Sequence, residues 1–212
     1  MFFLQTNGSG VLSFNSPSSD FVLLATTTAS SSASISFDGY FSSTYENYKV
    51  IFNSVKASTS QYFRMRFRQS NADATSSLYL GGLIGQRQIY DGASYYLPER
   101  NLTHTEPSGG AGFNYISLAY NNGAEESESQ VSSTTNTSVN GEIFLYNPLS
   151  TSNFKYSKID VRYRATGDSW NGALTHWQGS IVYQSATALS GISFIPSTGT
   201  FTTGTFKLYG IK

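Results

Sequence analysis

Length, composition and charge already exclude several classes of protein. The chain has 212 residues, of which only 12% are charged, with 13 Lys and Arg against 13 Asp and Glu and no cysteine. The lack of cysteine excludes disulfides, thiolate metal sites and a cysteine nucleophile, and the zero net charge offers no electrostatic footprint for nucleic acid or an anionic membrane. Hydroxyl residues, 35 Ser and 21 Thr, supply the polarity that charge does not. Because such a surface provides little charge repulsion between copies, we expect a protein that works inside an assembly.

The first 20 residues differ from the rest of the chain. They are rich in Gly and Ser and contain one short alternating stretch at residues 11–14, so we expect an N-terminal arm at residues 1–20 and a single domain at residues 21–212. The apolar residues 1–4 lack the basic flank and the long apolar run of a signal peptide, and no later stretch approaches the ~20 residues of a membrane span. We therefore expect an unprocessed, soluble product.

Alternation of apolar and polar residues predicts strands along the rest of the chain. The clearest case lies between residues 63 and 68, where three apolar residues alternate with three arginines. A strand buries the apolar set and holds the guanidinium groups on its other face, whereas a helix would scatter them. Further strands are expected at residues 21–27, 34–37, 47–53, 78–84, 88–96, 113–120, 142–146, 158–164, 175–183, 192–195 and 206–209.

About a dozen short strands and no helix-length apolar period predict an all-β fold. Residues that turns demand punctuate the strands; they include Gly39, Gly81-Gly82, Asp91-Gly92, Gly109-Gly110, Asn121-Asn122-Gly123, Asn147-Pro148, Asn171-Gly172 and Pro196. We expect an antiparallel β-sandwich, jelly-roll-like, because that topology is common for this number of strands. Residues 123–137, which carry three glutamates among Ser, Thr and Asn, are expected to form an exposed loop.

The residues that catalysis or metal binding needs are sparse. His104, expected in a polar loop, and His176, expected on a strand beside Trp177, do not have the spacing that brings two ligands together. Asp168-Ser169 has no distant acid–histidine pair to activate it, which indicates a turn instead. We therefore expect no enzyme, with no catalytic residue, no metal site and no cofactor.

Two groups of side chains are candidates for contacts with partners. Arg64, Arg66 and Arg68 can pair with carboxylates of an acidic glycan or protein surface; the alternative is a solvated strand face paired with Asp160 or Glu142. The second group consists of aromatic residues that can stack on sugar rings or fill a subunit interface, and the alternative for them is packing inside the sheets. These residues are Tyr90, Tyr95, Tyr96, Trp170 and Trp177.

Several short phrases, in order, resemble those of a known family. The opening Leu4-Gln5-Thr6-Asn7-Gly8-Ser9-Gly10-Val11-Leu12-Ser13-Phe14 and the closing Gly204-Thr205-Phe206-Lys207-Leu208-Tyr209-Gly210-Ile211-Lys212 are similar to the two ends of tailed-phage virion proteins, especially those of marine and cyanobacterial phages. Between them, Ser43-Thr44-Tyr45-Glu46-Asn47-Tyr48, Arg66-Phe67 and Leu145-Tyr146-Asn147-Pro148 also fit. The resemblance spans nearly the whole chain and rests on the order of its phrases.

This resemblance implies a structural protein on the outside of a virion. It implies a jelly-roll-like sandwich, often a homotrimer, that contacts other copies and other virion proteins of the capsid or tail, and it carries over no catalytic residue. The favoured role is a capsid decoration, cement or head-fibre subunit; the alternative is a tail-fibre adhesin that binds host surface glycan. The arm can dock by adding a strand to a neighbouring subunit, or it can pair within its own sandwich. Its candidate docking residues are Phe2, Phe3, Leu4, Leu12 and Phe14.

Overall fold

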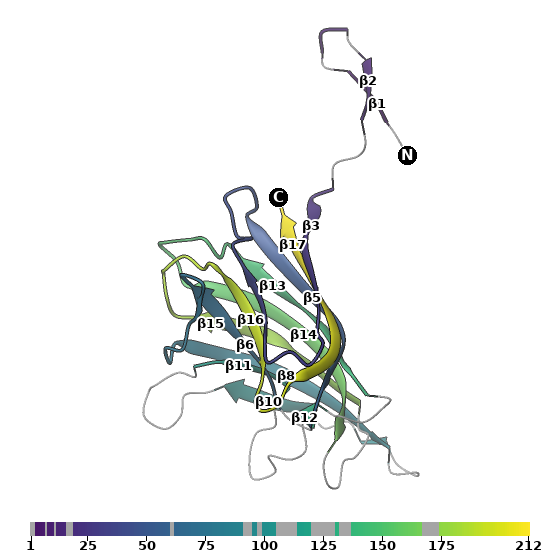
Figure 1. Ribbon diagram of the computed structural model, residues 1–212, viewed down its shortest axis with the longest axis vertical. Coiled ribbons are helices and arrows are strands. Elements are labelled where there is room, and N and C mark those ends of the chain that lie inside the picture. The colour runs from purple at the N-terminus through teal and green to yellow at the C-terminus, as the bar shows by residue number, and fades with distance from the viewer. Residues whose placement is uncertain are drawn as a thin grey trace.

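The computed structural model describes residues 3–6, 8–10, 12–15, 19–59, 62–90, 95–96, 99–104, 114–119, 130–131, 137–166 and 174–212. In this part of the chain every regular element is a strand, and the strands pair antiparallel in sheets that pack as a sandwich (Figure 1). The predicted all-β sandwich is therefore confirmed. No helix in the described ranges is long and apolar enough to cross a membrane.

The larger sheet forms one layer of the sandwich. Its main path runs β10-β8-β15-β14-β13-β5-β17-β3, with β9 added beside β8 and β12 beside β14. The bounds of these strands are β3 (Phe21–Thr28), β5 (Asn47–Ala57), β8 (Tyr79–Tyr90), β9 (Tyr95–Tyr96), β10 (Glu99–His104), β12 (Gln130–Val131), β13 (Val139–Tyr146), β14 (Lys155–Thr166), β15 (Leu174–Tyr183) and β17 (Phe201–Ile211).

The smaller sheet forms the second layer. Its order is β11-β6-β16-β4, with β7 beside β6. The strands are β4 (Ile35–Asp38), β6 (Phe63–Gln69), β7 (Ala72–Asp73), β11 (Ile116–Ala119) and β16 (Gly191–Pro196).

The core lies between the two sheets and is built from alternate residues of each strand. Phe63, Met65 and Phe67 of β6 are all buried, which confirms the predicted orientation of that strand. Phe63 meets Phe52 of the larger sheet edge to face, with the ring centroids 5.2 Å apart, and Phe194 and Phe206 pack around them. Aromatic contacts of this kind add to the stabilisation that burial alone provides.

Four local predictions are wrong, although the strand pattern as a whole is confirmed. Residues 78–84 and 88–90 belong to one strand, β8, which passes through Gly81-Gly82 without a turn. A Cβ on Gly81 would lie 2.9 Å from Ile181 Cγ1, so close approach of β15 explains this glycine. The other three errors are smaller: His104 ends strand β10 instead of lying in a loop, Pro196 is the last residue of β16, and the predicted loop at 123–137 contains β12.

The N-terminal arm forms a hairpin of its own. Strand β1 (Phe3–Thr6) pairs with β2 (Leu12–Asn15), and no other described strand pairs with either. Gly8 and Gly10 between them have φ near +80°, a conformation that glycine adopts without strain. In Figure 1 the hairpin stands beyond the end of the sandwich at which the C-terminus lies. The alternative that the arm pairs within its own sandwich is therefore wrong.

Candidate functional site

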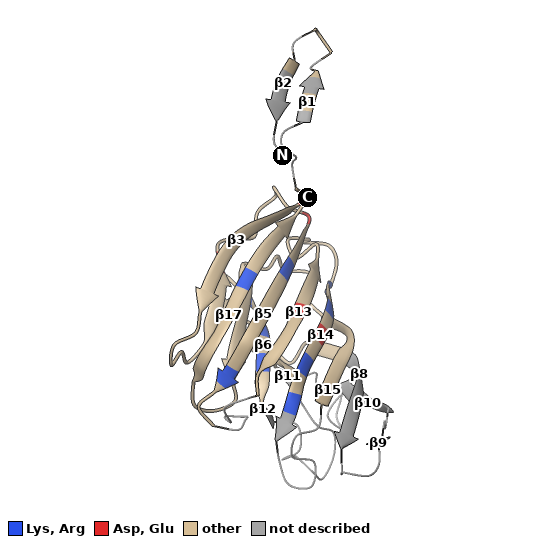
Figure 2. Ribbon diagram, turned by 90° about the vertical axis from the view of Figure 1, so that its right-hand side faces the viewer, with Lys and Arg blue, Asp and Glu red and all other residues tan. Residues whose placement is uncertain are grey.

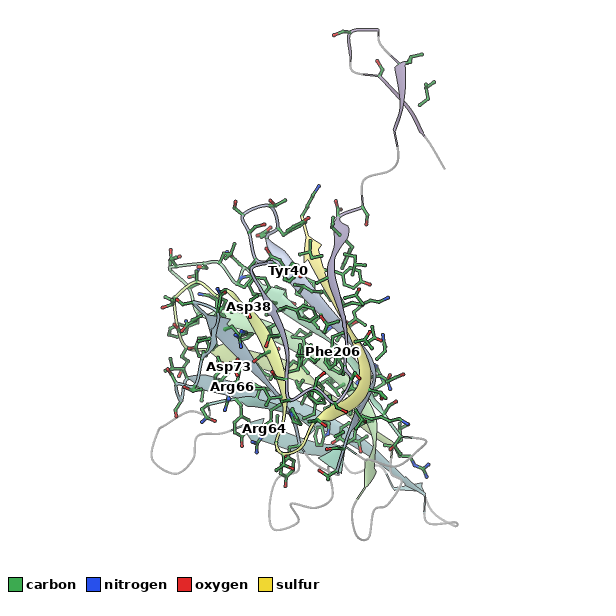
Figure 3. All side chains as sticks on the ribbon, in the orientation of Figure 1. Asp38, Tyr40, Arg64, Arg66, Asp73 and Phe206 are labelled. Atoms are coloured by element: carbon green, nitrogen blue, oxygen red, sulfur yellow. The ribbon has the colours of Figure 1, made fainter. Side chains whose placement is uncertain are left out.

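The three arginines of β6 lie on the face of the smaller sheet that points away from the core. Figure 3 shows Asp38, Asp73, Arg66 and Arg64 following one another along this sheet. We call the surface formed by Asp38, Asp73, Arg64, Arg66 and Arg68 the arginine face. Its charged groups have different partners.

Arg68 is held from several sides. Its Nε donates a 2.7 Å hydrogen bond to Asp38 Oδ1, its Nη1 lies 2.5 Å from Asp73 Oδ1, and its Nη2 donates to the carbonyl of Asn71. Burial acts to lower the pKa of Arg68, but the hydrogen bonds and charges of Asp38 and Asp73 outweigh it and raise this pKa above its ordinary value. Arg68 is therefore a structural cation.

The ion pair between Arg68 and Asp38 spans an intervening strand. Both residues have Gly191 of β16 as their register partner, Asp38 from one side and Arg68 from the other. A Cβ on Gly191 would lie 1.9 Å from the Phe37 carbonyl oxygen and 3.0 Å from Asp38 Oδ1. The glycine thus leaves the space through which the two side chains meet.

Asp73 connects the arginines to the sheet beneath them. It accepts a 2.7 Å hydrogen bond from the hydroxyl of buried Ser193, and its Oδ2 lies 3.6 Å from Arg66 Nη1. Arg66 Nε donates a 2.9 Å hydrogen bond to the carbonyl of Asn114. A polar layer therefore covers the outer face of the smaller sheet, held by hydrogen bonds to charged groups, which are among the stronger ones in proteins.

Arg64 differs from the other two arginines. Its guanidinium carbon lies 4.1 Å from the ring centroid of Tyr115 and 5.8 Å from that of Tyr62, which is cation–π geometry. Its Nε is buried and has no hydrogen-bond partner, and Arg64 forms no ion pair with any described residue. Of the three arginines, Arg64 is the one whose charge is not balanced by a neighbouring carboxylate in the described part of the chain.

The predicted pairing of the arginine face with Asp160 or Glu142 is wrong. These two carboxylates lie on the larger sheet, where Asp160 Oδ1 is 2.6 Å from Arg162 Nη1 and Glu142 Oε2 is 2.7 Å from Lys49 Nζ. Figure 2 faces this sheet and shows charged residues on several of its strands, with basic and acidic residues close together on β14. The error arose because ion pairs between strands depend on which strands become neighbours, and the sequence pattern does not contain that information.

The predicted aromatic contacts have mixed outcomes. Trp177 is buried and its Nε1 donates a 2.8 Å hydrogen bond to the Tyr163 hydroxyl, so it is part of the core and cannot stack on a sugar. Tyr95 and Tyr96 form β9, but their side chains, like that of Tyr90, lie outside the described ones. Trp170 and Asp168-Ser169 also lie outside the described residues.

The candidate docking residues of the arm are described in part. The side chains of Leu4 and Leu12 are 58% and 63% exposed. Phe3 and Phe14 are described only as backbone positions of β1 and β2, and Phe2 lies outside the described residues. In the register of the hairpin Leu4 pairs with Phe14 and Thr6 with Leu12. Cross-strand partners share a face, so positions 4, 6, 12 and 14 lie on one side of the hairpin.

The larger sheet carries exposed apolar residues that the sequence analysis missed. Phe21, Leu23, Tyr146 and Tyr156 are each about half exposed. Phe21, Tyr146 and Tyr156 lie in one register row across β3, β17, β5, β13 and β14. Tyr146 and Tyr156 directly follow the buried Leu145 and Lys155, so the alternation of side chains places the two tyrosines on the outward, polar face of their strands. This alternation could have predicted their exposure. In β3 the apolar residues are consecutive, so the sequence does not show which of them face outward.

A buried lysine was also missed. Lys155 is 1% exposed, and its Nζ donates to the carbonyls of Ser150, Asn153 and Ser185 at 2.6, 2.8 and 3.3 Å. Burial lowers the pKa of Lys155 below its ordinary value. The three carbonyls come from two loops, so this side chain fixes both of them to the start of β14.

An open groove of about 710 Å³ lies between the loops at the C-terminal end of the sandwich. Hydroxyl and amide side chains dominate its lining, with one carboxylate and one lysine. The residues are Ser43, Thr44, Tyr45, Glu46, Asn147, Leu149, Ser150, Thr151, Ser152 and Lys212. The Tyr45 ring packs against Gly210, where a Cβ would lie 2.5 Å from it, so this ring is committed to the sheet below.

The ranges that the structure describes contain no group of three or more His, Cys, Asp or Glu residues that could hold a metal ion. His176 Nε2 lies 3.3 Å from Asp160 Oδ1, but the two atoms do not form a hydrogen bond. The side chain of His104 lies outside the described ones.

Comparisons of the chain with protein-family models, with curated proteins and with solved structures found no match. By its fold, the chain is an antiparallel β-sandwich protein with an N-terminal hairpin.

Proposed function

We propose that the chain is a non-enzymatic structural subunit on the exterior of a tailed-phage virion, a capsid decoration, cement or head-fibre protein that docks through its N-terminal arm. The observation that carries the proposal is the arm itself. Residues 1–19 contain no charged residue, and the described part forms a hairpin apart from both sheets with Leu4 and Leu12 exposed. An isolated two-stranded hairpin is marginally stable in water, so an arm of this kind gains most from a partner surface.

The strand pairing supports a jelly-roll topology, which many subunits of this kind use. β3 pairs with β17, β4 with β16, β5 with β13 and β6 with β11. The first of these eight strands thus pairs with the last, the second with the second last, and so inward, with successive pairs alternating between the sheets. Nested pairing of this kind folds a two-stranded ribbon across a sandwich as two Greek keys. The strands β14, β15, β8 and β10 widen the larger sheet beyond it.

The arginine face is consistent with a structural role. Arg66 and Arg68 are paired with Asp38, Asp73 and backbone carbonyls. Their positive charges therefore stabilise the smaller sheet and are not available to bind a substrate. The subunit is proposed as non-enzymatic, with no cofactor and no catalytic residue. Its proposed partners are other copies of itself, in a homotrimer, and capsid or tail components of the virion.

Incorporation into particles tests the proposal. Phage carrying the gene without codons 2–15 should assemble particles that lack the protein, while the full chain is retained after purification. A Leu174→Lys variant is the control, because Leu174 is as exposed as the arm leucines but lies on the sandwich. It should be retained like the full chain. Retention of the truncated protein at the normal level would contradict docking through the arm.

Arg64 supports the alternative function, an adhesin for host surface glycan. Its guanidinium, beside Tyr62 and Tyr115, has donors that no described carboxylate uses, and a guanidinium fork pairs well with the carboxylate of an acidic sugar. A glycan array with the purified protein should then give acidic-glycan signals that Arg64→Ala abolishes. Arg162→Ala, which removes an exposed arginine of the other sheet, should leave them unchanged. An array without signal above background would remove this alternative.

A further inference from the structure

Strand β3 leaves one edge of the larger sheet open. It is the terminal strand of its sheet and pairs with β17 alone among the described strands. Its eight residues, Phe-Val-Leu-Leu-Ala-Thr-Thr-Thr, include no charged residue and no proline, and Phe21 and Leu23 are 50% and 52% exposed. Monomeric proteins protect such edges with charges, prolines, β-bulges or very short strands, because an open edge recruits further strands. The register of β3 with β17 shifts once, between Leu23 and Ala25, so β3 has one bulge but neither a charge nor a proline. An edge of this length without charge or proline therefore indicates a partner strand.

The N-terminal hairpin also lacks neighbouring strands. It is a two-stranded sheet with two open edges, and it has no core of its own. The positions of Leu4 and Leu12 share one face, and a hairpin added beside β3 could place this face next to Phe21 and Leu23. Since neither segment carries a charge, no ion would be desolvated when they meet.

We propose that the hairpin of one copy adds to the open edge of β3 in a second copy of this chain. The inference rests on the docking role proposed for the arm and names the surface that receives it. The added strands extend the larger sheet of the second copy by main-chain hydrogen bonds, while the leucines cover Phe21 and Leu23. The hairpin pairs with the first half of β3, because the exposed apolar residues lie there and the second half is threonine-rich.

The geometry favours a second copy over the same chain. The backbone N–H of Lys212 donates a 3.1 Å hydrogen bond to the carbonyl of Asp20, which ties the base of the arm to the end of β17. Beyond this point the hairpin extends away from the sandwich in Figure 1. A contact between an arm and a different surface on the next copy is head to tail, and it closes into a ring when the rotation between copies allows. Arm exchange of this kind is compatible with a trimer.

Disulfide trapping tests the proposal directly, because the chain has no cysteine of its own. Full-length Leu4→Cys and Leu23→Cys variants are purified separately, mixed and oxidised. We expect a disulfide-linked dimer of the two different chains, in a yield several times that of Leu4→Cys mixed with Leu174→Cys. Equal yields from the two mixtures would overturn the proposal. A Leu4→Cys/Leu23→Cys double variant that closes within one chain at high dilution, without linking to a second chain, would also overturn it.

Lysine substitutions give an independent measurement on the uncrosslinked protein. Leu23→Lys puts a charge beside the open edge, and we expect it to shift the sedimentation coefficient of the full chain from oligomer to monomer. Leu174→Lys should leave the oligomer intact, and circular dichroism should show both variants folded. An unchanged oligomer in Leu23→Lys would contradict the proposal.

The two proposals fail in different ways. If the cysteines do not link but the arm is still required for incorporation into particles, the arm docks on another virion protein, and only the exchange between copies is lost. If the copies link but particles never contain the protein, the virion role is lost and the exchange remains.

Discussion

Arg68 and Asp38 form a 2.7 Å ion pair although their strands, β6 and β4, are not neighbours. The strand between them, β16, contributes Gly191 at the crossing point, so no side chain blocks the contact. Both ionised groups are partly buried, with side chains 16% and 30% exposed. The pair therefore joins β6 to β4 across the intervening strand β16.

Removing the carboxylate should destabilise the sandwich. We expect Asp38→Asn to lower the free energy of unfolding by about 1–3 kcal/mol, because Arg68 keeps its charge in a partly buried place and loses one of its anionic partners. Urea denaturation measures the change. Glu142→Gln is the matched control: it removes a carboxylate that pairs with Lys49 at a more exposed site and should cost about 0–1 kcal/mol. Equal losses in the two variants would contradict the structural role of Arg68.

Gly191 itself should not tolerate a side chain. A Cβ at this position would lie 1.9 Å from the Phe37 carbonyl oxygen, which is backbone and cannot rotate away. We expect Gly191→Ala to cost about 1–3 kcal/mol or more, the range for overpacking a filled site. Ser36→Ala, at an exposed position of β4, should change the stability by less than about 0.5 kcal/mol. Thermal unfolding of the two variants side by side checks the expectation, and a neutral Gly191→Ala would refute it.

The buried hydrogen bond between Trp177 and Tyr163 gives a third prediction. Tyr163→Phe removes the acceptor and leaves the indole N–H of Trp177 without its partner, which should cost about 1–3 kcal/mol. Tyr156→Phe removes a hydroxyl from the exposed face of the same strand and should be nearly neutral. Urea denaturation followed by tryptophan fluorescence measures both, and matching stabilities for the two variants would show that the bond contributes little.

Lys155 should make stability depend on alkaline pH. Because burial lowers its pKa in the folded state below the ordinary 10.5, the folded protein releases this proton before the unfolded chain does as pH rises. In the window between the lowered pKa and 10.5 the unfolded state binds more protons, so the contribution of Lys155 to stability increases with pH there. Subtracting the unfolding free energy of Lys155→Met from that of the unchanged protein isolates the contribution.

The matched control for Lys155 is Lys158→Met, an exposed lysine on the same strand. At neutral pH this control should change the free energy of unfolding by less than about 0.5 kcal/mol. Lys155→Met should also cost about 1–3 kcal/mol at neutral pH, since three carbonyls lose their donor. A difference that falls as pH rises would contradict the lowered pKa.

The strands and their buried faces could be predicted because a strand alternates its side chains with a fixed period. The segment around Met65 shows this best, since each apolar residue there is buried and each arginine faces outward. The partners of those arginines could not be predicted. Asp38 contacts Arg68 through the register of three strands, and that register is set by the packed sheets as a whole.

Two glycine-containing pairs show what the sequence can and cannot predict about turns. The Gly81-Gly82 pair looks like a turn, but it lies within β8 because β15 approaches too closely for a side chain. The Asn7-Gly8 pair, by contrast, indicates a turn in the sequence of the arm. It could have predicted that β1 and β2 pair with each other, although the five residues between Thr6 and Leu12 exceed the two-residue loop that Asn-Gly favours.

The position of β17 restricts the order in which the fold can form. It lies between β3 and β5, pairing Lys207 with Thr26 on one side and with Ile51 on the other. These contacts join residues more than 150 positions apart, and loops of that length close slowly. While the ribosome is still making the segment before β17, β3 has no neighbour on either side, and its apolar residues remain exposed. Synthesis therefore passes through a long interval in which the nascent chain is prone to aggregation.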